Sequence, residues 1–175
     1  MGEVLLRRAE ERDLAVIAHI NSTVFLGDRD RAEGAREWVE ALYKSYPVYQ
    51  YFIVEIDGAV AGYAGWQMHG GFHRAEPVVE LDQIGIDPAY QGNQLAPQLT
   101  RYGMRELAEW LKKKDNRIES HIAFIVWAYV LNFNAISVYA KDFTDGVCGM
   151  RTQFGQRAEV MLRVRLPVVM PVRAA

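Results

Sequence analysis

One segment near the middle of the chain constrains the fold most strongly, because its pattern changes from a strand to a helix within a few residues. Residues 78–86 are rich in β-branched and apolar side chains, which is typical of a strand. A turn at Asp87-Pro88 follows. Residues 95–113 then keep helical spacing, with Leu99 and Tyr102 on one face and Lys112 near the C-terminal end, where it complements the helix dipole. The sequence therefore predicts a strand, a tight turn and an amphipathic helix.

The same two periodicities predict the remaining elements. A two-residue turn at Asp57-Gly58 joins two runs of aromatic and β-branched residues, which is a strong hairpin signal. Asp13 is expected to cap the first helix, and a polar loop is expected at 25–34. Strands are expected at 4–8, 49–56, 60–66, 118–127, 147–153 and 158–166, and helices from residue 14, at 35–46 and at 133–141. With the strand at 78–86 this order predicts an α/β (α+β) fold with a mixed, mostly antiparallel sheet of about seven strands flanked by helices, and it does not match a doubly wound fold.

Size and composition indicate one globular domain. The 175 residues are half apolar and carry no repeat or linker, so we expect a domain at 1–166 and a tail at 167–175. The formal net charge of -2 argues against nucleic acid and an anionic membrane as partners. The single cysteine, Cys148, excludes an internal disulfide. Without a leader or a long apolar run, the chain is expected to be cytoplasmic.

The start of the helix at residue 95 is a candidate anion site. The first N–H groups of a helix have no partner within the helix, and the helix dipole favours negative charge there. Gly92 keeps the preceding loop free of side-chain bulk, and Pro97 suits the first helical turn, where its missing donor costs nothing. These features predict a phosphate site. A plain strand-to-helix connection explains the same spacing equally well.

The segment resembles the signature of the GNAT superfamily of N-acetyltransferases, which is Gln/Arg-x-x-Gly-x-Gly/Ala. Gln91 and Ala96 match its first and last positions, and Gln94 stands where the family usually has glycine. A side chain at that position must point away from the phosphates, or the local backbone must relax, since glycine alone adopts positive φ without cost. The resemblance implies acetyl-CoA as co-substrate, with its pyrophosphate held by the loop Gln91, Gly92, Asn93, Gln94, Leu95 and Ala96.

A second segment resembles the family's later motif, in which asparagine, alanine and tyrosine recur at fixed intervals. Asn132, Ala135 and Tyr139 fall at these intervals, whereas the ending at Phe143 is one residue short. In the family a bulge splays the two central parallel strands apart, and the pantetheine arm pairs with the exposed strand backbone. By resemblance, the backbone groups come from Ile84, Gly85 and Ile86, and Asn132, Ala135 and Tyr139 complete the cofactor site.

The resemblance implies direct attack of an amine on the thioester. Tyr139 matches the family's general acid, a phenol near the sulfur of CoA; its alternative role is packing against the cofactor. The amine must lose a proton to a base. Glu80 and Asp82 lie on one face of the strand by alternation and can bind or deprotonate an amine, or else face solvent or pair with arginines. The strand before Asn132 offers no glutamate.

The acceptor site has weaker signals. Acidic residues of the 25–34 loop could favour a cationic amine, and three aromatic side chains could line a pocket or belong to the core: Asp28, Asp30, Glu33, Trp66, Trp127 and Tyr129. His69 and His73 lack a third ligand, so no metal is expected. The apolar tail is expected to pack against the domain or to contact a second copy in a homodimer.

The leading hypothesis is therefore an N-acetyltransferase that acts on a primary amine. The alternative is a catalytically silent acyl-CoA-binding or sensing domain. The sequence leaves the acceptor open among small amines, antibiotics, amino acids and proteins.

Overall fold

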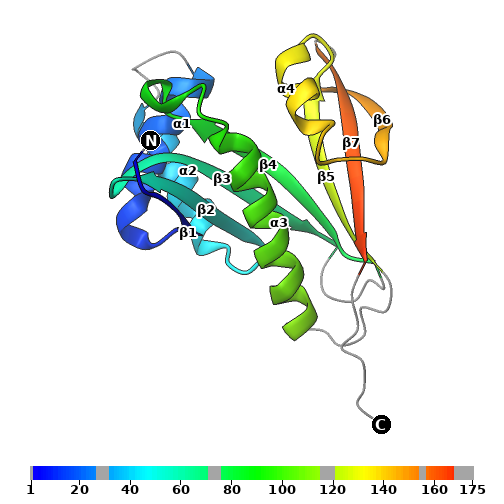
Figure 1. Ribbon diagram of the computed structural model, residues 1–175, viewed down its shortest axis with the longest axis horizontal. Helices are drawn as coiled ribbons and strands as arrows, with labels where there is room; N and C mark the ends of the chain where they lie inside the picture. The colour runs from blue at the N-terminus through cyan, green and yellow to red at the C-terminus, as the bar shows by residue number, and fades with distance from the viewer. Residues whose placement is uncertain (1, 27–31, 71–75, 115–120, 154–156, 168–175) are drawn as a thin grey trace. The chain divides into compact units, whose positions relative to one another are not determined.

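The computed structural model describes residues 2–26, 32–70, 76–114, 121–153 and 157–167. They form a mixed α/β fold with one seven-stranded sheet in the order β1-β2-β3-β4-β5-β7-β6 (Figure 1). β4 and β5 are the parallel pair, and the sheet is mostly antiparallel, so the expected fold class is confirmed. The strands are β1 (Val4–Arg8), β2 (Tyr49–Ile56), β3 (Ala59–His69), β4 (Val78–Ile86), β5 (His121–Tyr129), β6 (Gly146–Gln153) and β7 (Arg157–Pro167). The helices are η1 (Glu11–Asp13), α1 (Leu14–Asn21), the π-helical η2 (Ser22–Leu26), α2 (Ala32–Lys44), η4 (Pro88–Tyr90), α3 (Leu95–Lys114) and α4 (Phe133–Tyr139).

The chain forms two compact units. The first consists of residues 1–67 and 81–103, and the second of residues 68–80 and 104–175. The single domain at 1–166 and the tail at 167–175 remain predictions.

The central hairpin has the turn that its sequence predicts. β2 and β3 pair antiparallel with Ile56 opposite Ala59, which leaves Asp57 and Gly58 as a two-residue loop. Their φ angles are 50° and 80°, the left-handed conformation that a hairpin turn of this length requires. A register shift after Val54 adds one unpaired residue to β3.

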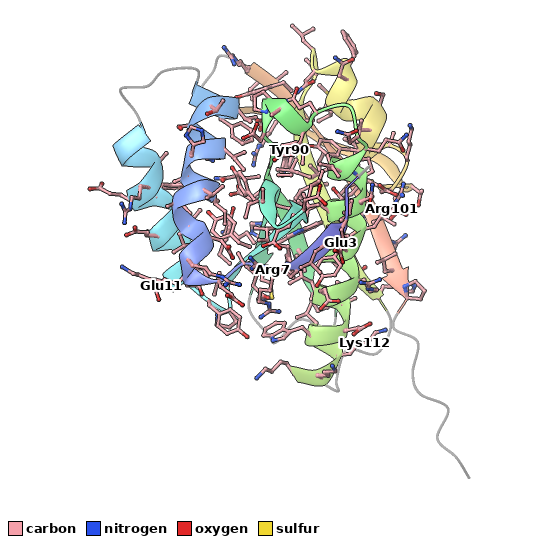
Figure 2. The ribbon with its side chains drawn as sticks, turned by 60° about the vertical axis from the view of Figure 1, so that its left-hand side comes forward. Glu3, Arg7, Glu11, Tyr90, Arg101 and Lys112 are labelled. Atoms are coloured by element: carbon pink, nitrogen blue, oxygen red, sulfur yellow. The ribbon has the colours of Figure 1, made fainter. Side chains whose placement is uncertain are left out.

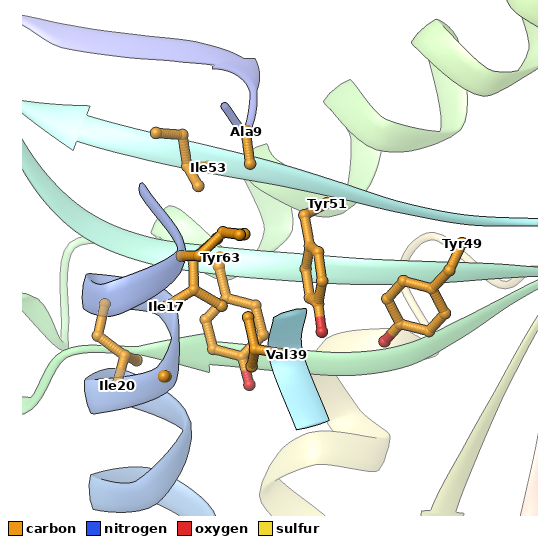
Figure 3. Packing of buried hydrophobic residues seen from close by; sticks show 10 residues of the cluster. Ala9, Ile17, Ile20, Val39, Tyr49, Tyr51, Ile53 and Tyr63 are labelled. Atoms are coloured by element: carbon orange, nitrogen blue, oxygen red, sulfur yellow. The ribbon is translucent and has the colours of Figure 1, made fainter. Parts of the chain in front are cut away.

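One face of the first unit is an aromatic core beneath α1 and α2. Tyr49 and Tyr51 alternate along β2 toward this face, and Tyr63 of β3 joins them (Figure 3). The Tyr49 and Tyr51 rings lie 4.9 Å apart and the Tyr51 and Tyr63 rings 5.9 Å apart, measured between centroids. Ile17 of α1 and Val39 of α2 are fully buried in the same cluster.

The N-terminal half of α3 covers the other face of the first unit. The Phe52 ring meets the Tyr102 ring edge-on at 5.8 Å between centroids. A Cβ atom at Gly103 would lie 2.4 Å from Nε1 of Trp66, so the helix approaches this tryptophan too closely for any side chain. The helical face predicted for α3 is therefore the packed face.

Asp13 does not cap α1, contrary to expectation. Its side chain makes no capping hydrogen bond to that helix. Instead the carboxylate accepts hydrogen bonds from the Arg7 guanidinium at 2.7 and 2.9 Å and from the Glu10 backbone N–H at 2.7 Å. Arg7, labelled on β1 in Figure 2, also bonds Glu55 of β2. A strand arginine thus outcompetes the helix N-terminus for this carboxylate.

The first two helices also differ from their predicted bounds. Part of the expected loop at 25–34 is helical, because η2 extends to Leu26 and α2 begins at Ala32. α2 ends at Lys44 rather than at residue 46, and the Ser45 N–H then bonds the Leu42 carbonyl in a closing turn. No helix among the described residues is long and apolar enough to cross a membrane.

The second unit is built on β5, β6 and β7. β5 is buried along almost its whole length, as expected for a strand covered on both faces. It pairs antiparallel with β7, which pairs with β6. Arg151 of β6 donates a hydrogen bond to the buried Glu159 of β7 at 2.6 Å, and its guanidinium lies 4.2 Å from the centre of the Trp127 ring.

Candidate functional site

The loop between β4 and α3 is a compact turn with unusual backbone angles. Asp87 starts it by accepting a hydrogen bond from the Ala89 N–H at 2.8 Å. Gly92 has a φ of 86°, and a Cβ atom there would meet no atom within 4 Å. Glycine is therefore required at this position by the backbone conformation and not by crowding.

Two side chains of the loop hold the loop itself. The Gln91 amide donates a hydrogen bond to the Ile86 carbonyl at 3.1 Å, which ties the loop back to the end of β4. The Asn93 amide donates to the Tyr90 carbonyl at 3.1 Å; Figure 2 labels Tyr90 at the turn that precedes α3. Both side chains are exposed. The two hydrogen bonds therefore help to fix the shape of the loop.

Gln94 adopts the glycine-like conformation that the family signature requires. Its φ is 55°, and its side chain is exposed. Its carbonyl accepts a hydrogen bond from the Gln98 amide at 3.3 Å. The left-handed conformation costs a non-glycine residue about 1–2 kcal/mol. The loop therefore contains a strained residue at Gln94.

α3 begins directly after this loop, where the sequence predicts an anion site. The helix is 20 residues long, so its backbone dipoles sum to a full macrodipole. Leu95 is buried and anchors the first turn, whereas residues 91–94 are exposed. A Cβ atom at Gly92 would meet nothing within 4 Å, so the loop is not crowded at this position.

The three β4 residues predicted to pair with the cofactor differ in burial. Ile84 and Ile86 are half-buried, and Gly85 is buried. A Cβ at Gly85 would lie 2.9 Å from Cε1 of Tyr63 and 3.2 Å from Cγ2 of Ile20. The glycine is therefore needed for close packing against the aromatic core.

The second predicted motif lies in the second unit. Asn132 is the N-cap of α4, and its side-chain oxygen accepts a hydrogen bond from the Ala135 N–H at 3.1 Å. The fixed interval between these two residues is thus the interval of a helix cap.

Tyr139 is the last residue of α4. Its ring meets the Phe143 ring edge-on at 6.1 Å between centroids, and its carbonyl accepts hydrogen bonds from the N–H groups of Asp142 and Phe143. Burial raises the pKa of the Tyr139 phenol to about 12. The phenol is therefore protonated at neutral pH.

The two carboxylates on β4 have different partners. Oε2 of Glu80 lies 2.6 Å from Nε2 of His69, the last residue of β3. Asp82 is exposed and accepts a hydrogen bond from the Tyr49 hydroxyl at 2.7 Å. Neither carboxylate pairs with an arginine in the structure's ion pairs between described residues. Sequence reasoning missed both partners.

A buried polar cluster at the end of α1 was also missed. The Asn21 amide donates hydrogen bonds to the Tyr63 hydroxyl at 2.6 Å and to the Gln83 side-chain oxygen at 3.0 Å. In a regular strand the side chains of the neighbours Asp82 and Gln83 would point to opposite faces of the sheet. Here both accept hydrogen bonds from tyrosines that lie on the same face. The partners are far apart in sequence, so local pattern gave no signal.

Some acceptor-side candidates lie outside the described residues. These are Asp28, Asp30 and His73, together with the side chain of Glu33. Within the described residues, no group of three or more His, Cys, Asp and Glu side chains could hold a metal ion.

The second unit contains a cavity of about 640 Å³. Tyr129, a predicted pocket residue, lines it, and the Arg157 guanidinium lies 5.2 Å from the centre of the Tyr129 ring. Val130, Leu131, Asn132 and Ala158 complete the lining. Trp66, by contrast, is buried in the core of the first unit.

The sequence family follows from a comparison with known domains. The model of the acetyltransferase (GNAT) family matches residues 14–143, which include the loop, both β4 carboxylates and Tyr139. The chain belongs to the acetyltransferase (GNAT) family. None of the curated protein sequences matches it.

Solved structures share the GNAT fold at low sequence identity. The ribosomal-protein-S18-alanine N-acetyltransferase of Escherichia coli is 18% identical, with a TM-score of 0.65 and 99% of both chains covered. The yncA protein of Salmonella typhimurium, solved with acetyl-CoA, is 22% identical, with a TM-score of 0.62 and coverage of 98% and 96%. Ard1 of Thermoplasma volcanium is 11% identical, with a TM-score of 0.66 and coverage of 93% and 97%.

Proposed function

We propose that this GNAT protein is an N-acetyltransferase that transfers the acetyl group of acetyl-CoA to a primary amine by direct attack in a ternary complex. The observation that carries the proposal is the loop before α3. It has two positive φ angles, at Gly92 and Gln94, and it lies at the start of a long helix, within the part of the chain that matches the family.

The pyrophosphate of acetyl-CoA is held by backbone N–H groups of the loop and of the first turn of α3. A Cβ atom at Gly92 would meet no atom within 4 Å, and the side chain of Gln94 is exposed. The family's arrangement assigns this contact to Gln91, Gly92, Asn93, Gln94, Leu95 and Ala96. The family's motifs assign the backbone of Ile84, Gly85 and Ile86 to the pantetheine arm. They also assign Asn132, Ala135 and Tyr139 to the cofactor.

Tyr139 is the general acid that protonates the departing sulfur. The proposal is supported by its position in the family motif. Burial raises the pKa of the phenol to about 12, so the proton that it would donate is in place at neutral pH. A phenol with this pKa stays protonated over the whole range in which amines react.

A carboxylate on β4 takes a proton from the amine. Glu80 is the first candidate, because its carboxylate is 12% exposed and therefore poorly hydrated. Asp82 is more exposed and suits binding of the ammonium form of the acceptor. We further propose a cytoplasmic location, which the exposed free thiol of Cys148 supports.

The proposal is tested by measuring free thiol released from acetyl-CoA in the presence of a polyamine, an aminoglycoside, an amino acid and a peptide with a free N-terminus. We expect turnover with at least one of these amines. Tyr139→Phe is expected to lower kcat by a factor on the order of 10², whereas Tyr43→Phe in α2 serves as the control and is expected to leave it unchanged.

Binding of acetyl-CoA, measured by calorimetry, separates the remaining outcomes. Saturable binding without turnover on any amine would favour the acyl-CoA-binding alternative. If acetyl-CoA does not bind and no amine is acetylated, the proposal is overturned.

A further inference from the structure

His69 and Glu80 form a hydrogen-bonded pair that the family motifs do not contain. His69 ends β3 and Glu80 lies near the start of β4, and both belong to the second unit. Nε2 of His69 lies 2.6 Å from Oε2 of Glu80. Among the described residues, Glu80 is the only hydrogen-bond partner of the His69 ring, and its carboxylate is ionisable.

The two partners differ in their access to solvent. The Glu80 side chain is 12% exposed, whereas the His69 side chain is 39% exposed. A base that has taken a proton from the amine must release it before the next turnover. The Glu80 carboxylate has little contact with water through which to do so, while the imidazole bonded to it reaches the surface.

An imidazole suits this transfer because its two nitrogens have different roles. In the neutral ring one nitrogen accepts a hydrogen bond while the other carries a proton. Nε2 can therefore accept the proton from Glu80, and Nδ1 can release its own proton to water. The ring is then neutral with its proton on Nε2, and proton exchange with water or rotation of the ring restores the starting tautomer before the next turnover. A glutamine in the same place can bond Glu80 but cannot carry a proton.

We propose that His69 carries the proton of the acceptor amine from Glu80 to solvent. The inference rests on the proposed function, with Glu80 as the base. An ammonium substrate gives one proton to the Glu80 carboxylate, and this proton leaves through His69. The neutral amine then forms the amide bond as the carbon–sulfur bond breaks, and its second proton ends on the sulfur of CoA. One proton is released to solvent in each turnover.

Two variants separate proton transfer from structural support. His69→Gln keeps a hydrogen-bond donor for Glu80, and His69→Ala removes the side chain. We expect kcat to fall in both by a factor of up to the order of 10², with the KM for acetyl-CoA and its binding constant unchanged. Added imidazole is expected to restore the rate of His69→Ala. The exposed His19→Gln is the control and keeps the wild-type rate.

If His69→Gln keeps the wild-type kcat, the proposal is overturned, and the contact between His69 and Glu80 has only a structural role. A loss in His69→Ala that imidazole does not restore would also overturn it. Absence of turnover in the wild-type protein with every amine is a different result, because it contradicts the proposed function itself.

Nuclear magnetic resonance of the wild-type protein gives a readout that does not depend on activity or on the folding of a variant. The His69 ring is assigned by substituting the other three histidines. A ring that is neutral over part of the pH range in which the enzyme is active supports the relay. A ring protonated throughout that range cannot accept a proton, and this result would overturn it.

Discussion

The Tyr49 hydroxyl donates a hydrogen bond to the Asp82 carboxylate across 2.7 Å and so links the start of β2 to β4. The tyrosine is 2% exposed and the aspartate lies at the surface. A Cβ at Gly65 would lie 2.2 Å from the Tyr49 oxygen, so the ring occupies the space above that glycine. A buried aromatic residue thus fixes the position of a surface carboxylate.

Replacement of Tyr49 by phenylalanine tests this link. The variant loses one hydrogen bond to a charged group, and we expect the free energy of unfolding to fall by about 1 kcal/mol because the exposed carboxylate regains water. If Asp82 binds the acceptor, the KM for the amine should rise several-fold while the KM for acetyl-CoA stays constant. Urea unfolding and steady-state kinetics measure the two effects. An unchanged unfolding free energy would show that the bond adds no stability.

Alkaline pH should destabilise the protein through its tyrosine core. Burial, followed by neighbouring charges, raises the pKa values of Tyr49, Tyr51 and Tyr63 above the ordinary value of 10.0. The unfolded chain therefore loses these protons at lower pH than the folded protein. Their contribution to stability is complete below about pH 10 and is lost as pH rises further. Unfolding free energies between about pH 8 and about pH 11 measure this loss.

Tyr51→Phe removes one of the titrating groups and should show a shallower decline. A decline equally steep in this variant would assign the alkaline instability to other groups.

Acid should weaken the ion pair between Arg7 of β1 and Asp13 of η1. Burial acts to raise the pKa of Asp13, but its hydrogen bonds to Arg7 and to the Glu10 N–H outweigh burial and hold the pKa below 3.8. The stabilisation is therefore present above the ordinary pKa and lost as pH falls through the folded value. We expect Asp13→Asn to cost about 2–3 kcal/mol at neutral pH and less in acid. A cost that does not change with pH would contradict an ionic origin.

The two positive-φ positions of the loop should respond in opposite directions. Gln94→Gly removes the left-handed strain but adds freedom to the unfolded chain, so we expect a net gain of about 0.5–1 kcal/mol. Gly92→Ala places a side chain at a φ of 86° and should cost about 1–2 kcal/mol. It should also weaken acetyl-CoA binding. Thermal unfolding measures the stability of both variants, and calorimetry measures their acetyl-CoA binding. A Gln94→Gly protein less stable than wild type would contradict the proposed backbone strain at Gln94.

The elements with local signals were predictable. Asp57 and Gly58 specify their turn by their own backbone preferences, and the structure confirms it. The sequence shows that Gln94 replaces the usual glycine of the family signature, and that a positive φ at this position is costly for any other residue. Both depend on residues close together in the chain.

Contacts made across the sheet could not be predicted. The sequence before α1 is typical of a cap at Asp13, but the Asp13 carboxylate instead accepts a hydrogen bond from Arg7 on β1. Glu80 was a candidate base from its strand position alone. Its partner His69 meets it because β3 and β4 run side by side, and strand register is set by pairing that no local pattern specifies.

The division of the chain into two units has a practical consequence for fragments. The backbone passes from one unit to the other inside β3, inside β4 and inside α3, never in a linker. A chain shortened from either end therefore loses part of a strand or a helix, or keeps only part of one unit. No single cut separates the two units, because each unit consists of two separate stretches of the chain.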